Sequence, residues 1–220
     1  MSEAIPATRL RIKFSKVGAL RYIGHLDLHH IWQRSIRRAG LPLVYSQGFH
    51  PQPKIQLASA LALGFSSQAE VLDIWIDEDA TWDQDALQAA APQGITIFDI
   101  QEVELHGPAL QTQVESAEYE VTLLDEISDS LLDEKLAAIM DAESILRPKR
   151  IKKKNRRFTT VPPTYDMRPL ILEMKRIAAQ QIFMRLTTQE GATGRPDEVL
   201  KEMGIPVEAA RVERTALNLK

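Results

Sequence analysis

The side chains of this chain limit the chemistry it can carry: it has five histidines and no cysteine among 220 residues. His25 and His29 stand four residues apart in "GHLDLHH", with Asp27 between them. On a helix that begins here, both imidazoles would share a face and could reach one metal ion. No third ligand follows at a defined spacing, and Asp27 suits a helix start for its charge alone. We therefore predict no metal, and keep His25 and Asp27 as candidate catalytic residues.

A third candidate, His50, lies in the stretch "YSQGFHPQPK". Gly48 is expected to supply a positive φ, Pro51 forces the residue before it into extended geometry, and Phe49 is expected to pack the loop down. On such a stiff segment His50 could act as a general acid or base, stack on a base or contact a phosphate. The alternative is a loop histidine without a role. We interpret the loop as a binding surface shaped by Gly48, Phe49 and Pro51 first, and as a catalytic site second.

Charge is segregated along the chain although its net value is only −3. Residues 1–60 hold nine Lys/Arg against two Asp/Glu, residues 61–145 hold one against twenty, and residues 146–160 hold eight and none. A chain with a basic pole can bind a polyanion there. We interpret the acidic middle as solvated surface; the alternative is that it docks a protein partner.

The densest basic run, "RPKRIKKKNRR" at 147–157, lies between segments predicted to be structured. A strand face with Arg9, Arg11 and Lys13 adds further cations, as does a helix stripe. Several cations favour nucleic acid over a small acidic ligand; a solvated loop is the alternative. The predicted nucleic-acid-binding residues are Arg34, Arg37, Arg38, Lys54, Arg147, Lys149, Arg150, Lys152, Lys153, Lys154, Arg156 and Arg157.

Hydrophobic periodicity predicts the elements that position these residues. Strands are expected at 8–16, 55–63, 69–77, 94–105, 117–124 and 210–219, with a hairpin within 168–188. Helices are expected at 26–39, at 83–91, from Ser128 or Asp129, and from Pro196, where the proline and two acids suit a first turn.

The order β-α-β-β-α-β over residues 9–105 is typical of ferredoxin-like units, and the second half repeats a similar order. We predict an α+β protein of two ferredoxin-like subdomains with antiparallel sheets and helices on one face. Their expected bounds are 1–106 and 114–220, with a linker at 106–113 and the basic segment 147–157 in the second. A single large α+β domain would explain the same pattern.

Several function classes are excluded by absent motifs. The sequence contains no GxxxxGK[ST], no GxGxxG after a strand, no HExxH and no GxSxG, so we expect no cofactor. No apolar run approaches the roughly 20 residues of a membrane helix, and the N-terminus lacks a secretory h-region. We expect a cytoplasmic protein with no membrane contact.

The chain resembles the radical SAM-linked proteins, an uncharacterised bacterial family encoded beside or fused to a radical SAM protein. The resemblance spans nearly the whole chain, and His25 and Asp27 fall inside it while His29 and His30 fall outside. Val71 stands where the family has an aromatic residue. The matching stretches are "FSKVGALRYIGHLD", "RRAGLPLVYSQGFHPQPKI", "LGFSSQAEVLD", "YDMRPLI", "GRPDEVL" and "RTAL".

The resemblance implies a radical SAM partner encoded nearby. Without cysteines, this chain cannot hold the cluster of such an enzyme, so we expect a non-catalytic accessory protein that binds RNA, tRNA or rRNA, and presents it for modification. One alternative is a metal-independent ribonuclease-like enzyme that uses His25 or His50. A second is a protein-interaction module for the radical SAM partner.

Overall fold

A computed structural model describes residues 7–149, 163–189 and 191–220 of the chain. The chain divides into two units, residues 1–115 with 212–220, and residues 116–211. The first unit therefore takes up the last nine residues, which the sequence had placed in a second subdomain at 114–220. They join it because the final strand pairs with a strand of the first unit.

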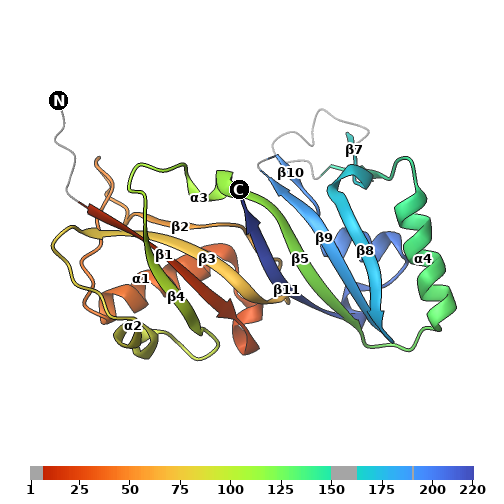
Figure 1. Cartoon of the computed structure of the whole chain (residues 1–220), viewed down its shortest axis with the longest axis horizontal. Helices are drawn as coiled ribbons and strands as arrows, with labels where there is room; N and C mark the ends of the chain where they lie inside the picture. Colours follow the sequence, from red (N-terminus) through yellow and green to blue (C-terminus); the bar gives the residue numbers. More distant parts are fainter. Residues whose placement is uncertain (1–6, 150–162, 190) are drawn as a thin grey trace. The chain divides into compact units, whose positions relative to one another are not determined.

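The first unit is built on β1 (Ala7–Lys16) and β3 (Ser66–Asp77), which pair antiparallel (Figure 1). β4 (Ile97–Val103) pairs with the other edge of β1. The second edge of β3 is shared: β2 (Ile55–Leu57) pairs antiparallel with its C-terminal half and β11 (Ala210–Leu219) runs parallel to its N-terminal half. Because β11 occupies that half, the strand predicted at 55–63 ends at Leu57.

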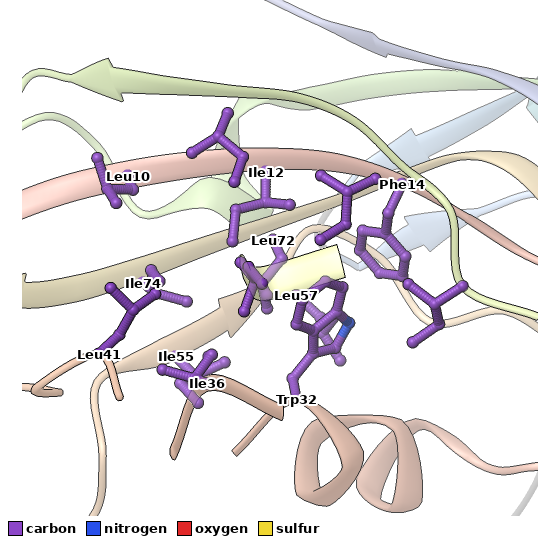
Figure 2. Packing of buried hydrophobic residues seen from close by; sticks show 14 of the residues in the cluster. Leu10, Ile12, Phe14, Trp32, Ile36, Leu41, Ile55, Leu57, Leu72 and Ile74 are labelled. Atoms are coloured by element: carbon purple, nitrogen blue, oxygen red, sulfur yellow. The ribbon is translucent and has the colours of Figure 1, made fainter. Parts of the chain in front are cut away.

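Helices cover one face of this sheet. η1 (Gly18–Tyr22) leads into α1 (His25–Arg38), and α2 (Gln84–Ala90) begins after Asp83, whose carboxylate accepts from two backbone amides. Figure 2 shows Leu10, Ile12 and Phe14 of β1 facing the α1 side chains. Phe14 and Trp32 meet edge to face, with ring centroids 4.7 Å apart. The apolar period of β1 therefore marks the face that the helices bury.

The opposite face is covered by the segment predicted to be a linker. Within residues 106–113 the chain forms α3 (Leu110–Gln113), and Leu110 is fully buried against Val71 and Val114. Arg9 holds the segment before α3 in place by donating hydrogen bonds to the backbone carbonyls of Glu104, Gly107 and Pro108. The predicted linker is thus an ordered part of the first unit.

The second unit is centred on β9 (Gln181–Gln189), which pairs antiparallel with β5 (Val114–Leu123) and with β8 (Ile171–Ala178). The turn of this predicted hairpin places Gln180 at φ 60°. α4 (Asp129–Asp141) packs against β8, with Ser128 as its N-cap. The remaining elements are β6 (Leu146–Pro148), β7 (Thr164–Asp166), η3 (Arg168–Leu170), β10 (Ala192–Thr193), α5 (Pro196–Glu202) and η4 (Val207–Ala209).

The predicted α+β class is confirmed, with mostly antiparallel pairing and five α-helices in the described residues. The finer assignment to two ferredoxin-like subdomains stays a prediction. In the part of the chain covered by the structure, no helix combines the length and apolarity that crossing a bilayer requires.

Candidate functional site

Three charged residues of the first unit lie on strand faces that are otherwise apolar. Lys16 continues the inward row of β1 after Phe14, Glu70 precedes Leu72 on the same face of β3, and Arg214 follows Val212 on β11. All three are almost fully buried, at 1%, 2% and 0% exposure. Buried charges are costly unless they are paired, so the partners of each decide what this cluster can do.

Glu70 and Arg214 form an ion pair. The guanidinium Nε donates to the carboxylate Oε1 at 3.0 Å, and a second guanidinium nitrogen donates to the same oxygen. Lys16 is different: its Nζ donates to the backbone carbonyl of Ile23 at 3.1 Å, and among the described residues no carboxylate lies within salt-bridge distance of it. Burial lowers the pKa of Lys16, Arg214 lowers it further, and Glu70 opposes both. Within the Lys16–Glu70–Arg214 cluster, Lys16 thus has a neutral hydrogen-bond partner, whereas Glu70 and Arg214 pair with each other.

His25, the first residue of α1, is close enough to this cluster for its charges to affect the imidazole. The Lys16 hydrogen bond to Ile23 fixes the turn that precedes it. Partial burial lowers the pKa of His25, the neighbouring His29, Arg214 and Lys16 lower it too, and Glu70 acts in the opposite direction. Solvent still reaches the side chain. On balance, these causes favour the neutral form of the imidazole.

The side chains considered as metal ligands in the sequence analysis make other contacts. The Nδ1 of His29 lies 3.3 Å from the Gln33 amide nitrogen, and burial is the largest cause of its lowered pKa. Asp27 is exposed in the first turn, with one oxygen turned towards Gly24. Within the described residues, no group of three or more His, Asp or Glu side chains is placed to hold a metal.

The loop from Tyr45 to Lys54 is closed at its base and open at its tip. Tyr45 and Pro53 form a β-bridge, and Ser46 and Gln52 exchange hydrogen bonds. Gly48 has φ 141°, as its role in the turn required. The prediction for Phe49 was wrong: its ring is fully exposed rather than packed down, because the closed base leaves the tip no core to reach. The loop presents Phe49, and His50 is exposed beside it.

The arginine stripe of α1 lies next to this loop. Arg34, Arg37 and Arg38 are exposed, and Arg38 donates to the backbone carbonyl of Ala90 at 2.6 Å. An open cavity of about 330 Å³ is lined by Arg37 together with Tyr45, which starts the loop. The cavity therefore joins a cation of α1 to an aromatic residue of the loop. Lys54, at the other end of the loop, is also exposed.

The cations predicted on the β1 face have structural roles instead. Arg9 and Arg11 both bind the carboxylate of Asp73, which is fully buried, at 2.6 to 2.9 Å. Lys13 lies 3.6 Å from Asp99. The expectation that Arg9 and Arg11 add to a binding surface was wrong, because α3 and the preceding segment cover them, whereas Lys13 is half exposed.

The basic run is described only at its start. Arg147 binds Glu198 at 3.0 Å and Glu202 at 2.9 Å, so its charge is paired with α5. Lys149 is exposed. The other predicted residues, Arg150, Lys152, Lys153, Lys154, Arg156 and Arg157, lie outside the described residues.

Sequence reasoning missed Lys16, Glu70 and Arg214, although a signal was present. Each is a charged residue in phase with the apolar residues of a period-2 strand. A charge at such a position must be paired or functional. Three of the stretches that resemble the family contribute to this cluster. One contains Lys16 and His25, one contains Glu70, and one contains Arg214.

Comparison with known proteins places the chain in a family and gives no function. A family profile described as "Uncharacterized protein conserved in bacteria (DUF2344)" matches residues 9–196. No curated protein matches the chain. A solved structure described as "Crystal Structure of a Cbf5-Nop10-Gar1 Complex" is 11% identical with a TM-score of 0.42, and covers 94% of this chain and 48% of that one. This chain therefore spans about half of that protein's length.

A second structure, described as "Crystal structure of putative glycine cleavage system transcriptional repressor", is 10% identical with a TM-score of 0.26. That alignment covers 94% of this chain and 96% of the other. At these TM-scores neither likeness assigns a fold or a function.

Proposed function

The chain belongs to this family of conserved bacterial proteins, and from that premise we propose that it is a non-catalytic RNA-binding accessory protein. The proposed RNA contact is the α1–loop surface, defined as Arg34, Arg37 and Arg38 of α1 with the loop from Tyr45 to Lys54. The lysines and arginines of 147–157 are proposed to add phosphate contacts from the second unit.

One observation carries this proposal: Arg37 and Tyr45 line the same open cavity, at the base of a loop whose tip exposes Phe49 completely. Proteins that bind single-stranded nucleic acid combine cations that follow the phosphates with aromatic rings on which bases stack. Exposed apolar rings are otherwise unfavourable in water. A cationic helix face beside an exposed ring therefore suits unpaired bases of an RNA better than a small anion.

The radical SAM partner is part of the proposal because of the sequence resemblance. A chain without cysteines cannot bind the iron–sulfur cluster of a radical SAM enzyme itself. Binding the RNA and presenting it to such an enzyme is a role that needs neither cluster nor catalytic residues here.

We also propose that each unit is ferredoxin-like. In the first unit, the strand order β4-β1-β3-β2 with α1 and α2 on one face supports this assignment. In the second, the order β8-β9-β5 with α4 packed against β8 supports it.

The test is RNA binding by the full chain across a salt series. With three α1 arginines contacting phosphates, the slope of log K against log salt should be roughly −2 for single-stranded RNA, and steeper if 147–157 takes part. The Arg34→Ala/Arg37→Ala variant should weaken binding about tenfold or more. Arg195→Ala/Lys201→Ala is the matched control, since it removes two exposed cations from the second unit and should leave the affinity within about twofold.

Two results would overturn the proposal: absence of RNA binding at low salt, or equal losses in the two double variants. Purification with the neighbouring radical SAM protein, with and without nuclease, distinguishes RNA-mediated association from a direct protein contact.

A second function is favoured by the neutral imidazole of His25 beside buried Lys16. A neutral histidine can take the proton of an RNA 2′-hydroxyl, as a metal-independent ribonuclease requires. If His25→Ala and His50→Ala both leave RNA processing unchanged, this alternative is excluded.

A further inference from the structure

We propose that the cavity lined by Arg37 and Tyr45 holds one unpaired base of the RNA, so that the α1–loop surface selects single-stranded over double-stranded RNA. This role deepens the RNA binding proposed above and depends on it. Three features of the cavity support it: the side chains of its lining, the contacts that fix its shape, and the charges around it.

The lining combines an aromatic ring, a guanidinium and apolar side chains. Tyr45, which is 42% exposed, belongs to the loop, and Arg37 belongs to α1. The remaining lining residues are Gly40, Leu41, Pro42 and Leu43. A base is flat, so it can stack on the ring and against the guanidinium, while its faces cover the aliphatic side chains. A free anion would use the guanidinium alone. The lining therefore fits a base better than phosphate or a carboxylate.

The size of the cavity suits a single base. Its volume of about 330 Å³ lies at the lower end of the roughly 300–1,000 Å³ typical of small-ligand sites. The fully exposed ring of Phe49, at the tip of the same loop, offers a stacking surface to a neighbouring base. One base in the cavity and another on Phe49 would both have to be unpaired.

The segment that lines the cavity is fixed by backbone contacts. At the end of α1, Gly40 has φ 75°, which favours glycine, and its N–H donates to the Arg37 carbonyl at 3.1 Å. Further along, the Val44 N–H donates to the Trp75 carbonyl of β3 at 2.8 Å. The β-bridge made by Tyr45 then closes the base of the loop. Because the segment is already ordered, binding a base requires little further ordering of the chain.

The charges around the cavity favour a base inside it and phosphates along α1. Asp77 donates its backbone N–H to the Pro42 carbonyl at 3.1 Å, so the exposed acidic stretch 77–79 begins next to Pro42 and repels phosphates there. The last turn of α1 carries the partial negative charge of the helix dipole, which also disfavours a phosphate within the cavity. An uncharged base meets neither repulsion, whereas the arginines of α1 attract the phosphates that flank it.

Double-stranded RNA cannot fill this cavity while its bases remain paired. Extruding one base from a duplex costs both its stacking and its pairing, and the major groove of A-form RNA is too narrow for side chains to reach the bases. A duplex can still place its phosphates on the α1 arginines. We therefore expect the chain to prefer a single strand to the duplex of the same sequence by about tenfold or more.

The experiment measures the affinity of the full chain for one RNA strand, alone and annealed to its complement, by fluorescence anisotropy at fixed salt. Tyr45→Leu removes the ring and keeps an apolar side chain; Arg37→Lys keeps the charge and loses the flat guanidinium. Each should reduce the preference for the single strand to within about threefold, whereas Tyr45→Phe should retain it. Arg37 is exposed, so Arg37→Lys tests the cavity even if Tyr45→Leu does not fold.

The matched control is Arg211→Lys, which makes the same exchange at an exposed position of β11 and should keep the parental preference. A second probe is a single strand whose central nucleotides lack their bases, which preserves the phosphates. The parent should bind it about tenfold more weakly than the intact strand, and the loss should be smaller in Tyr45→Leu.

Equal or tighter binding of the duplex by the parent would overturn the base site and leave the RNA-binding proposal intact. An unchanged preference in both Tyr45→Leu and Arg37→Lys would do the same, as would an equal loss in Arg211→Lys. Absence of binding to every RNA at low salt would overturn both proposals. The two failures are therefore distinguishable.

Discussion

Arg214 on the last strand and Glu70 on β3 form a buried ion pair across 144 positions of sequence. Removing one partner of such a pair leaves the other charge buried and unpaired, which typically lowers the free energy of unfolding by about 3–5 kcal/mol. We therefore expect Glu70→Gln and Arg214→Met each to lower the free energy of unfolding by about that amount. Urea denaturation at pH 7 measures it.

The double variant Glu70→Gln/Arg214→Met supplies the control. Since both charges are then removed together, its loss should be clearly smaller than the sum of the two single losses. Additive losses would show that the pair does not act as a unit.

Lys16→Met is expected to behave in the opposite way. The substitution removes a desolvated ammonium that lacks a carboxylate partner, at the cost of one hydrogen bond to Ile23, worth about 1 kcal/mol. The unfolding free energy should stay within about 1 kcal/mol of the parent or rise above it. A loss as large as that of Arg214→Met would contradict this expectation and identify Lys16 as a structural residue.

Asp73 holds two guanidinium groups, those of Arg9 and Arg11, on the face covered by α3. Asp73→Asn should lower the free energy of unfolding by about 3–5 kcal/mol, because both arginines would keep their burial and lose their carboxylate. Asp99→Asn is the matched control: its partner Lys13 is about half exposed, so the change should be below about 1 kcal/mol. Similar losses in both variants would contradict this.

Periodicity predicted most of the elements and the core face of β1, but not that the opposite face of that strand is covered too. The row Leu10, Ile12, Phe14 identified β1 and its core face correctly. The alternate row with Arg9 and Arg11 looked solvent-facing, yet it is covered by residues 104–113. A period of two shows which residues share a face; only long-range packing decides whether the second face is covered too.

Only part of the candidate site could be predicted from the sequence, for a related reason. His25 and the loop around Phe49 stood out because histidine, glycine and proline have local signatures. The cluster beneath His25 needs the register of β11 against β3, where Arg214 pairs with Ser67. Nothing local in the sequence specifies that register.

Phe49→Ala separates a binding role from a structural one. The ring is fully exposed and adds no burial to the fold, so the unfolding free energy should change by less than about 0.5 kcal/mol. RNA affinity should fall by about 1–3 kcal/mol if a base stacks on the ring. Fluorescence anisotropy measures the affinity, and Phe49→Trp, which keeps an aromatic face, should restore it. Loss of stability with unchanged affinity would contradict the binding role.

The two histidines at the start of α1 predict how stability depends on pH. Burial is the largest cause of the lowered pKa of both His25 and His29, relative to the ordinary value of 6.5. Between the lowered folded values and 6.5, the unfolded chain binds more protons than the folded one, so stability rises with pH through this window and levels off above it. Unfolding measured from pH 5 to 7.5 keeps most carboxylates ionised.

Removing both rings should flatten that dependence. His25→Gln/His29→Gln is expected to lose most of the slope below pH 6.5, whereas His30→Gln, which removes only the smallest cause of the lowered His29 pKa, should keep most of it. If the parental slope persists in the double variant, the destabilisation at low pH arises from other groups and these two histidines are not its source.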